Sequence, residues 1–391
     1  MACMNNLNMI TQMRRRRQEV IFFIMHILII APEQIPVPPP VGGSVEHSIY
    51  QIARNISPEH QVTIISRLRS GYPKKKILGN ITLIRVAGRN KHDYLSNVIK
   101  TVKGQHYDMI QIDNRPRFVP TVRKAFPHTK ISVFLHSTTF ISSPMTTKKQ
   151  AASDLSGANC IVGNSLSLQN HLKRTFPAIS GKVRYVHLGV DLDQFRPRKK
   201  KTTSAHRPFV ILFAGRLIPR KGIPVLMKAI KIVRKSIPSA RLHIAGGTGK
   251  LSYKKYLKEL ASSLRISVTF KGYVPRSQMP GFYRSGDCFV CPSQGHEAFG
   301  LVNVEAMASG IPTIASRNGG IPEIINHQQN GILVTNYRSP EAFAKEITNL
   351  AQNPSLAKKL SKQARIDVTE KFSWRAAARK LEKIYTSNIS Q

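Results

Sequence analysis

The feature that most constrains this chain is an alternation of short β-branched runs with helical patterns, which occurs twice. The strands expected in the first half are His26–Ala31, Val62–Ser66, Ile81–Val86, Met109–Ile112, Ile131–Leu135 and Cys160–Gly163. Those expected in the second half are Val210–Ala214, Arg241–Ala245, Val268–Phe270, Cys288–Cys291, Pro312–Ala315 and Gly331–Leu333. Such alternation predicts parallel sheets with helices on both faces. We therefore predict an α/β protein of two doubly wound domains that face a cleft.

The domain boundaries follow from a change in composition near the middle of the chain. Residues 196–207 include Lys199–Lys201 and small polar side chains, which indicates a solvated linker. We predict a first domain over residues 25–200 and a second over residues 207–372. Each is long enough to bury a core of its own.

The first 24 residues form an appendage for which we expect no ordered structure. Arg14–Arg17 precede the apolar Val20–Ile24, an order typical of signal peptides. The apolar run continues, however, through His26–Ala31 into Pro32 without a small-residue cleavage site. We interpret His26–Ala31 as a buried strand and Met25 as the native start; a cleaved signal is the alternative.

The composition narrows the class of protein. Sixty Lys and Arg residues against 20 Asp and Glu give a net charge of +40, which favours polyanionic partners such as anionic lipid or wall polymer. Only 7% of residues are aromatic, and no basic-aromatic motif suggests specific binding of nucleic acid. No apolar run approaches the roughly 20 residues of a membrane span. Four scattered cysteines indicate a reducing compartment, so we expect a cytoplasmic protein.

A glycine and two cations follow the strand Val210–Ala214. Ligands of open α/β sheets bind beyond the carboxyl ends of the strands. At this position Gly215 permits close backbone approach, Arg216 supplies a bidentate fork and Lys221 a point charge. These residue types suit a diphosphate. The alternative is that two cations near a glycine mean little in a chain with 60 basic residues.

Two carboxylates stand eight positions apart, at Glu297 and Glu305, on either side of the expected start of a helix over 301–309. Glu297 precedes the helix and can contact a ligand, while Glu305 can reach vicinal hydroxyls on another part of it. The free amides at the helix start form an anion site, and they belong to Gly300, Leu301 and Val302. The alternative is a surface helix with two solvated acids.

Together these residues resemble the retaining glycosyltransferases of family 4, which have the GT-B fold of two Rossmann-like domains. The resemblance runs from about Met25 to the C-terminus. It is carried by the Glu297 and Glu305 frame, by Glu323 in its Gly-Gly turn, and by residues 187–197. The first-domain segments 113–116 and 135–137 are most similar to the spore-coat glycosyltransferases of Bacillus-type bacteria.

The resemblance implies roles for the donor-binding residues. Arg216 and Lys221 would hold the diphosphate of a nucleotide-sugar and stabilise its departure. Glu297 would contact the transferred sugar, near the backbone amides of Phe299 and Gly300. Glu305 would hydrogen-bond the ribose hydroxyls.

The resemblance also implies roles outside that frame. The main chain from Gly272 to Val274 would face the base, and His136 would face the sugar across the cleft, beside Gly43. The catalytic residues implied are therefore Glu297, His136, Arg216 and Lys221. A final helix over residues 373–391 would cross back onto the first domain.

The activity implied is transfer of a hexosyl-type sugar, with retention, from a nucleotide-diphosphate sugar. The acceptor would be a glycan, a lipid-linked molecule or a protein of the cell envelope or spore surface, and no metal or other cofactor would be required. Asp191 and Asp193 match a metal-binding Asp-x-Asp only superficially, so we expect them to be structural. The alternative function is a non-catalytic spore-coat component that keeps this fold.

Two further patterns are interpreted as structural. Cys288 and Cys291 have the spacing of a zinc or redox pair, but a structural zinc site needs four ligands and no second pair exists. A buried strand explains them better. Lys74–Lys76 and Lys199–Lys201 are interpreted as solvated loops.

Overall fold

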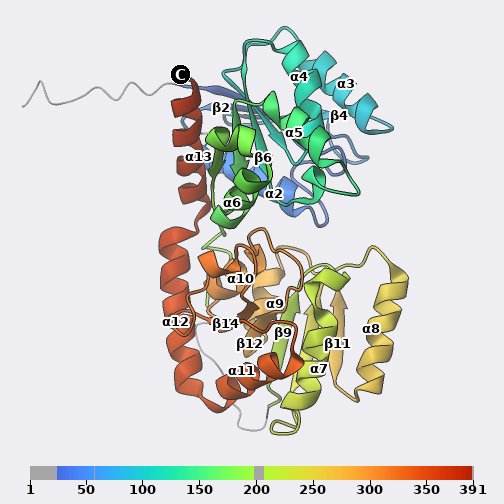
Figure 1. Cartoon of the computed structure of the whole chain (residues 1–391), viewed down its shortest axis with the longest axis vertical. Coiled ribbons are helices and arrows are strands. Elements are labelled where there is room, and N and C mark those ends of the chain that lie inside the picture. Colours follow the sequence, from blue (N-terminus) through green and yellow to red (C-terminus); the bar gives the residue numbers. More distant parts are fainter. Residues whose placement is uncertain (1–23, 57, 198–206, 390–391) are drawn as a thin grey trace, which may run out of the picture.

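The computed structural model describes residues 24–56, 58–197 and 207–389. Residues 1–23 of the predicted appendage, and Lys199–Lys201 of the predicted linker, lie outside the described residues. The chain forms two α/β domains stacked along the long axis of the molecule (Figure 1).

The elements of the first domain are β1 (His26–Ile30), α2 (Ser44–Ile56), β2 (Gln61–Arg67), β3 (Lys75–Leu78), β4 (Ile81–Val86), α3 (Lys91–Val102), β5 (Met109–Asp113), α4 (Val119–Ala125), β6 (Lys130–Leu135), α5 (Lys148–Ser156), β7 (Cys160–Gly163), α6 (Leu166–Thr175) and β8 (Val183–Tyr185). The elements that follow are β9 (Val210–Ala214), α7 (Ile223–Val233), β10 (Arg241–Ala245), α8 (Leu251–Ser263), β11 (Val268–Gly272), α9 (Met279–Arg284), β12 (Cys288–Cys291), α10 (Leu301–Ala308), β13 (Thr313–Ser316), β14 (Ile332–Val334), α11 (Pro340–Gln352), α12 (Pro354–Lys371) and α13 (Trp374–Ile389).

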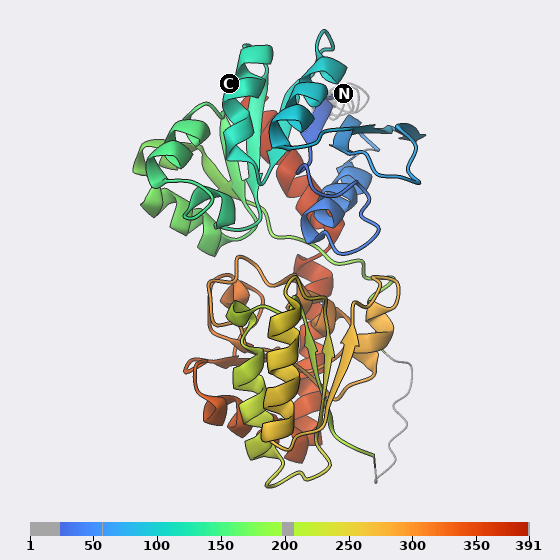
Figure 2. The same cartoon turned by 90° about the vertical axis from the view of Figure 1, so that its right-hand side faces the viewer.

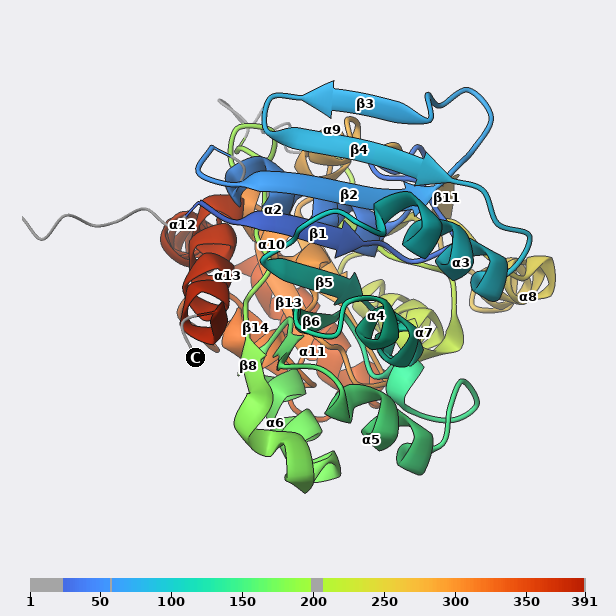
Figure 3. The ribbon, with the colours of Figure 1, turned by 90° about the horizontal axis from the view of Figure 1, so that it is seen from above.

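Each domain is built on a largely parallel sheet. The first sheet has the order β3-β4-β2-β1-β5-β6-β7-β8, and only β3 is antiparallel to its neighbour (Figure 3). The second has the order β11-β10-β9-β12-β13-β14 and is parallel throughout. Strands β5, β12 and β13 are buried along their whole length, which explains their continuous apolar runs. The predicted fold of two doubly wound α/β domains is confirmed.

Two strands were absent from the prediction. Lys75 and Lys76 belong to β3, so the loop interpretation is wrong for them. They are nevertheless exposed, and lysines on an edge strand discourage pairing with another chain. Strand β8 has only three residues, which is too short to produce a readable alternation. The buried strand predicted for Cys288 and Cys291 is confirmed as β12.

The last helix, α13, leaves the second domain and packs on the first (Figures 1 and 2). Its neighbour there is α2. The buried side chains of α13 recur every three or four positions, as expected of an amphipathic helix, and they are Trp374, Ala377, Ala378, Leu381 and Tyr385. Helix α13 thus completes the core of the first domain.

The carboxyl ends of strands from the two sheets approach one another, and hydrogen bonds join the domains there. The backbone amide of Gly42 donates to the hydroxyl of Tyr273 over 3.2 Å. No helix of the described chain is long and apolar enough to cross a membrane.

Candidate functional site

An ion pair between Lys221 and Glu297 lies at the carboxyl edge of the second sheet. Lys221 ends the turn after β9, and Glu297 stands between β12 and α10. The Lys221 ammonium donates to Oε2 of Glu297, as does the Ser293 hydroxyl over 2.9 Å. Burial is the strongest single influence and opposes ionisation of Glu297. The charge and hydrogen bond of Lys221, the hydrogen bond from Ser293 and the charge of Arg220 together outweigh it and lower the pKa of the carboxyl. Two ammonium protons of Lys221 remain for an anion.

Two arginines add positive charge beside this pair. Burial of its guanidinium and the nearby Arg220 lower the pKa of Arg216, while Glu297 acts in the opposite direction. An arginine stays protonated at neutral pH regardless. Three cations, Arg216, Arg220 and Lys221, therefore interact electrostatically with the Glu297 carboxylate. The excess positive charge suits a diphosphate.

The start of α10 offers unpaired backbone donors next to Glu297. Gly300 caps the helix with a φ of 96°, a left-handed conformation that favours glycine. The amides of Gly300, Leu301 and Val302 donate no hydrogen bond to another described residue, and neither does the amide of Phe299 just before them. Free amides and the positive end of a helix together attract anions.

The Gly319-Gly320 turn supports the backbone of Glu297. The Gly320 amide donates to the carbonyl oxygen of Glu297 over 2.8 Å, and a Cβ on Gly319 would collide with that oxygen. Glycine is therefore required at position 319 because the Glu297 carbonyl oxygen lies too close to leave room for a Cβ. Phe299 is buried, with its ring stacked on His187.

Glu305 is also buried, but its carboxylate already has partners. Its side chain is 5% exposed; Oε1 accepts from Arg276 over 2.8 Å and Oε2 from Tyr283 over 2.9 Å. Each carboxylate oxygen can accept a second hydrogen bond. A ribose contact at Glu305 stays a prediction, and it requires a hydroxyl to reach a carboxylate held by Arg276.

The loops after β9, β10 and β11 are hydrogen-bonded to one another. The amide of Gly215 donates to Ala245 and the amide of Gly246 donates to Gly272, over 2.9 and 2.7 Å. The carbonyl of Gly272 is thus already an acceptor, and Val274 packs against the core. The role of this loop toward a base stays a prediction.

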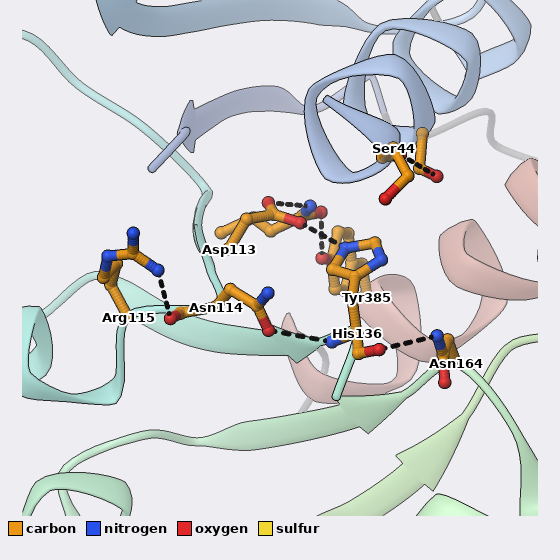
Figure 4. Close-up of polar contacts among 9 residues, drawn as sticks. Ser44, Asp113, Asn114, Arg115, His136, Asn164 and Tyr385 are labelled. Atoms are coloured by element: carbon orange, nitrogen blue, oxygen red, sulfur yellow. Dashed lines mark hydrogen bonds and ion pairs between the residues drawn. The ribbon is translucent and has the colours of Figure 1, made fainter. Parts of the chain in front are cut away.

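His136 belongs to the first domain and is held on several sides (Figure 4). Nε2 lies 2.9 Å from Oδ1 of Asp113, and the His136 amide donates to Asn114 over 3.0 Å. Its ring stacks on Phe134 with centroids 4.7 Å apart. Adjacent parallel strands β5 and β6 place Asp113 beside His136, a neighbour that strand order could have predicted.

Glu46 is a titratable group that the sequence analysis missed. It is on α2, near Gly43, and only 4% exposed. Burial raises its pKa, although His136 and Arg115 act in the opposite direction. No short sequence motif could have identified Glu46, because its perturbed pKa results from burial in the folded chain.

Replacing Glu46 by glutamine tests this burial. A carboxyl whose pKa is raised on folding stabilises the fold below its unfolded pKa, and that contribution is lost as pH rises through the folded pKa. At neutral pH the buried charge therefore costs stability, so we expect Glu46→Gln to raise the melting temperature at pH 7.5. The gain should vanish below about pH 4. A lower melting temperature of Glu46→Gln than of wild type at pH 7.5 would contradict a destabilising charge on Glu46.

Glu323 joins the two domains. Its carboxylate accepts from the amides of Leu166 and Ser167 at the start of α6, each over 2.7 Å, and lies 2.6 Å from His187. An acid at a helix N-terminus is favourable. Glu323 therefore fastens the second domain to the first.

Two groups within the described ranges have the residue types of metal ligands. Asp191 accepts from the amides of Asp193 and Gln194, a turn-forming contact. Glu59, His60 and Glu382 place ligand atoms within 4.8 Å of one another. However, Nδ1 of His60 accepts from the Met25 amide, so the neutral ring carries its proton on Nε2 toward Glu382. That tautomer disfavours a metal at Nε2.

Family profiles cover most of the chain. The profile described as "Glycosyltransferase Family 4" matches residues 41–194, and "Glycosyl transferases group 1" matches residues 194–367. YtcC of Bacillus subtilis (strain 168), named as a glycosyltransferase, is 31% identical over 94% of this chain and 93% of its own length. Spore coat protein SA of the same organism is 27% identical over 93% of this chain and all of its own length.

A likeness to solved structures supports the same fold. HepE of Anabaena, solved in complex with UDP and glucose, superimposes with a TM-score of 0.75. The two chains are 19% identical, and the match covers 93% of this chain and 100% of HepE.

Proposed function

We propose that this chain, which belongs to glycosyltransferase family 4, transfers a hexosyl group from a nucleotide-diphosphate sugar to an acceptor of the cell envelope or spore surface. The observation that best supports this proposal is that Lys221, Arg216 and the free amides at the start of α10 lie around Glu297. Cations and amides fixed in advance of the reaction stabilise a developing anion. HepE was solved in complex with UDP, so a UDP-sugar is the first donor to test.

The bond that breaks joins the anomeric carbon to the diphosphate. Its electron pair passes to the departing oxygen, where Arg216 and Lys221 neutralise the new charge. An acceptor hydroxyl bonds to the anomeric carbon on the same face, with retention, and its proton passes to the leaving phosphate. Glu297 stabilises positive charge on the sugar while it orients Lys221.

The first domain would supply the acceptor side. A cavity of about 450 Å³ there is lined by Arg67, Arg89, Lys91 and His92, with Glu33 and other side chains. Cations predominate, which favours an acceptor that carries negative charge, such as a lipid-linked phosphate. Work in the cytoplasm at an anionic membrane surface would suit this acceptor and the net charge of +40.

Stabilisation by nucleoside diphosphates tests the proposal. We expect one of UDP, GDP, ADP and CDP to raise the melting temperature in the presence of EDTA, because a ligand of the native state stabilises it. Pyrophosphate and heparin are the controls, since so basic a chain binds polyanions in general. Equal shifts for every polyanion, or a shift abolished by EDTA and restored by Mg²⁺, would contradict a specific, metal-independent donor site.

The likeness to spore coat protein SA favours a second candidate, a coat component that keeps the fold without catalysis. The intact Glu297–Lys221 pair argues against it. Transfer of labelled sugar to membrane extracts, measured for wild type and Glu297→Gln, decides between the two. Sugar transfer by the wild type but not by Glu297→Gln would support the enzymatic function.

A further inference from the structure

A chain of buried hydrogen bonds runs from His136 to the C-terminal helix (Figure 4). Tyr385 of α13 donates to Oε1 of Gln111 over 2.6 Å. Nε2 of Gln111 donates to Oδ2 of Asp113 over 2.6 Å, and Oδ1 of Asp113 lies 2.9 Å from Nε2 of His136. Tyr385, Gln111 and Asp113 are each at most 1% exposed. We call these three residues, together with His136, the relay.

The chemistry of the groups sets the direction of the relay. The Asp113 carboxylate only accepts, so Gln111 must turn its amide toward Asp113 and its carbonyl toward Tyr385. The Tyr385 hydroxyl must then donate. At the other end, His136 must carry a proton on Nε2 to meet Asp113, so Nδ1 of the neutral ring has the lone pair.

The surroundings leave His136 little other freedom. Its carbonyl accepts from Asn164 over 3.2 Å and its amide donates to Asn114. The charged side chains in electrostatic contact with this region are Asp113 of β5, Glu46 of α2 and Arg115. The His136 side chain is only 6% exposed, but Nδ1 is not completely buried and makes no hydrogen bond to another described residue. A ligand hydroxyl could therefore supply the missing hydrogen bond.

We propose that Tyr385, Gln111 and Asp113 are positioning residues that hold His136 as the Nε2-protonated tautomer, so that Nδ1 accepts a hydrogen bond from a substrate hydroxyl. This inference rests on the proposed function, in which His136 faces the sugar. It also assigns a task to α13: the end of the chain, which continues from the second domain, orients a side chain of the first. The relay would also contribute to substrate specificity. A hydrogen-bond acceptor at Nδ1 favours a substrate with a hydroxyl at this position over one with an ether or a deoxy carbon.

The spectroscopic test uses the full-length protein labelled with ¹⁵N-histidine. His136→Gln assigns the His136 signals, and the ¹⁵N shifts then report which ring nitrogen carries the proton. We expect the Nε2-protonated form in wild type and a mixture of tautomers in Asp113→Asn, whose side chain can donate as well as accept. A wild-type ring protonated on Nδ1, or an unchanged tautomer in Asp113→Asn, would overturn the proposal.

The kinetic test compares two buried tyrosines. Tyr385→Phe removes the first donor of the relay; Tyr94→Phe is the matched control, because Tyr94 is equally buried and donates to the Ala31 carbonyl, outside the relay. Loss of one hydrogen bond predicts a fall in kcat of about three- to tenfold for Tyr385→Phe with donor KM unchanged. Tyr94→Phe should keep kcat within about twofold.

Equal kcat values in the two variants would overturn the positioning role of Tyr385. A wild type that transfers no sugar would contradict the proposed function instead. The tautomer measurement needs no substrate, so it decides the relay in either case.

Discussion

Replacing Arg216 by alanine is expected to lower kcat by about 10²–10³-fold while the fold remains intact. Arg216 is an exposed residue overall, although its guanidinium is partly buried, and it makes no side-chain hydrogen bond to another described residue. Its removal therefore leaves no hydrogen-bond partner behind. In the proposed mechanism, Arg216 acts when negative charge develops on the departing diphosphate. The measurement is turnover of the nucleotide-sugar identified by thermal shift, together with the melting temperature.

The control for Arg216→Ala is Lys228→Ala, which removes an exposed cation from α7 of the same domain. Lys228→Ala changes the net charge equally and should leave kcat unaltered. Near-normal turnover in Arg216→Ala would contradict the role of Arg216, and an equal loss in both variants would indicate a general electrostatic effect.

Replacing Lys221 by alanine is expected to reduce both turnover and stability. Lys221 and Glu297 are each 16% exposed, so the substitution leaves a largely buried carboxylate without its cation. The loss for a fully buried pair is about 3–5 kcal/mol, and partial exposure reduces our expectation to about 2–3 kcal/mol. Urea denaturation of wild type and variant measures it.

The pH dependence of this loss is a second readout. Pairing holds the pKa of Glu297 below its ordinary value of 4.5, so its stabilising contribution is complete above that unfolded value and is lost as pH falls through the folded pKa. The stability difference between wild type and Lys221→Ala should therefore shrink in acid.

Adding Glu297→Gln to Lys221→Ala is the structural control. It removes the unpaired charge and should restore much of the stability without restoring turnover. Additive losses in the double variant would mean that the two side chains are not coupled. Restored turnover would contradict the proposed role of Lys221.

The local pattern of the sequence was sufficient for the fold. Parallel strands buried on both faces are continuous apolar runs, so β5, β12 and β13 could be predicted from their residues alone. Arg216 and Lys221 follow one predicted strand, and Glu297 follows another, 76 residues after Lys221. The carboxyl ends of parallel strands lie at one edge of a sheet, which is where ligands bind.

Tertiary structure alone decided which polar groups meet across long separations. Pairing of Glu323 with the start of α6, burial of Glu46, and the approach of Tyr385 to Gln111 depend on the docking of domains and of α13. No short-range pattern encodes these contacts, because packing between distant elements determines them. Thus the sequence by itself determined the two sheets and placed Arg216, Lys221 and Glu297 at strand ends, whereas packing determined how His136 and Glu305 are held.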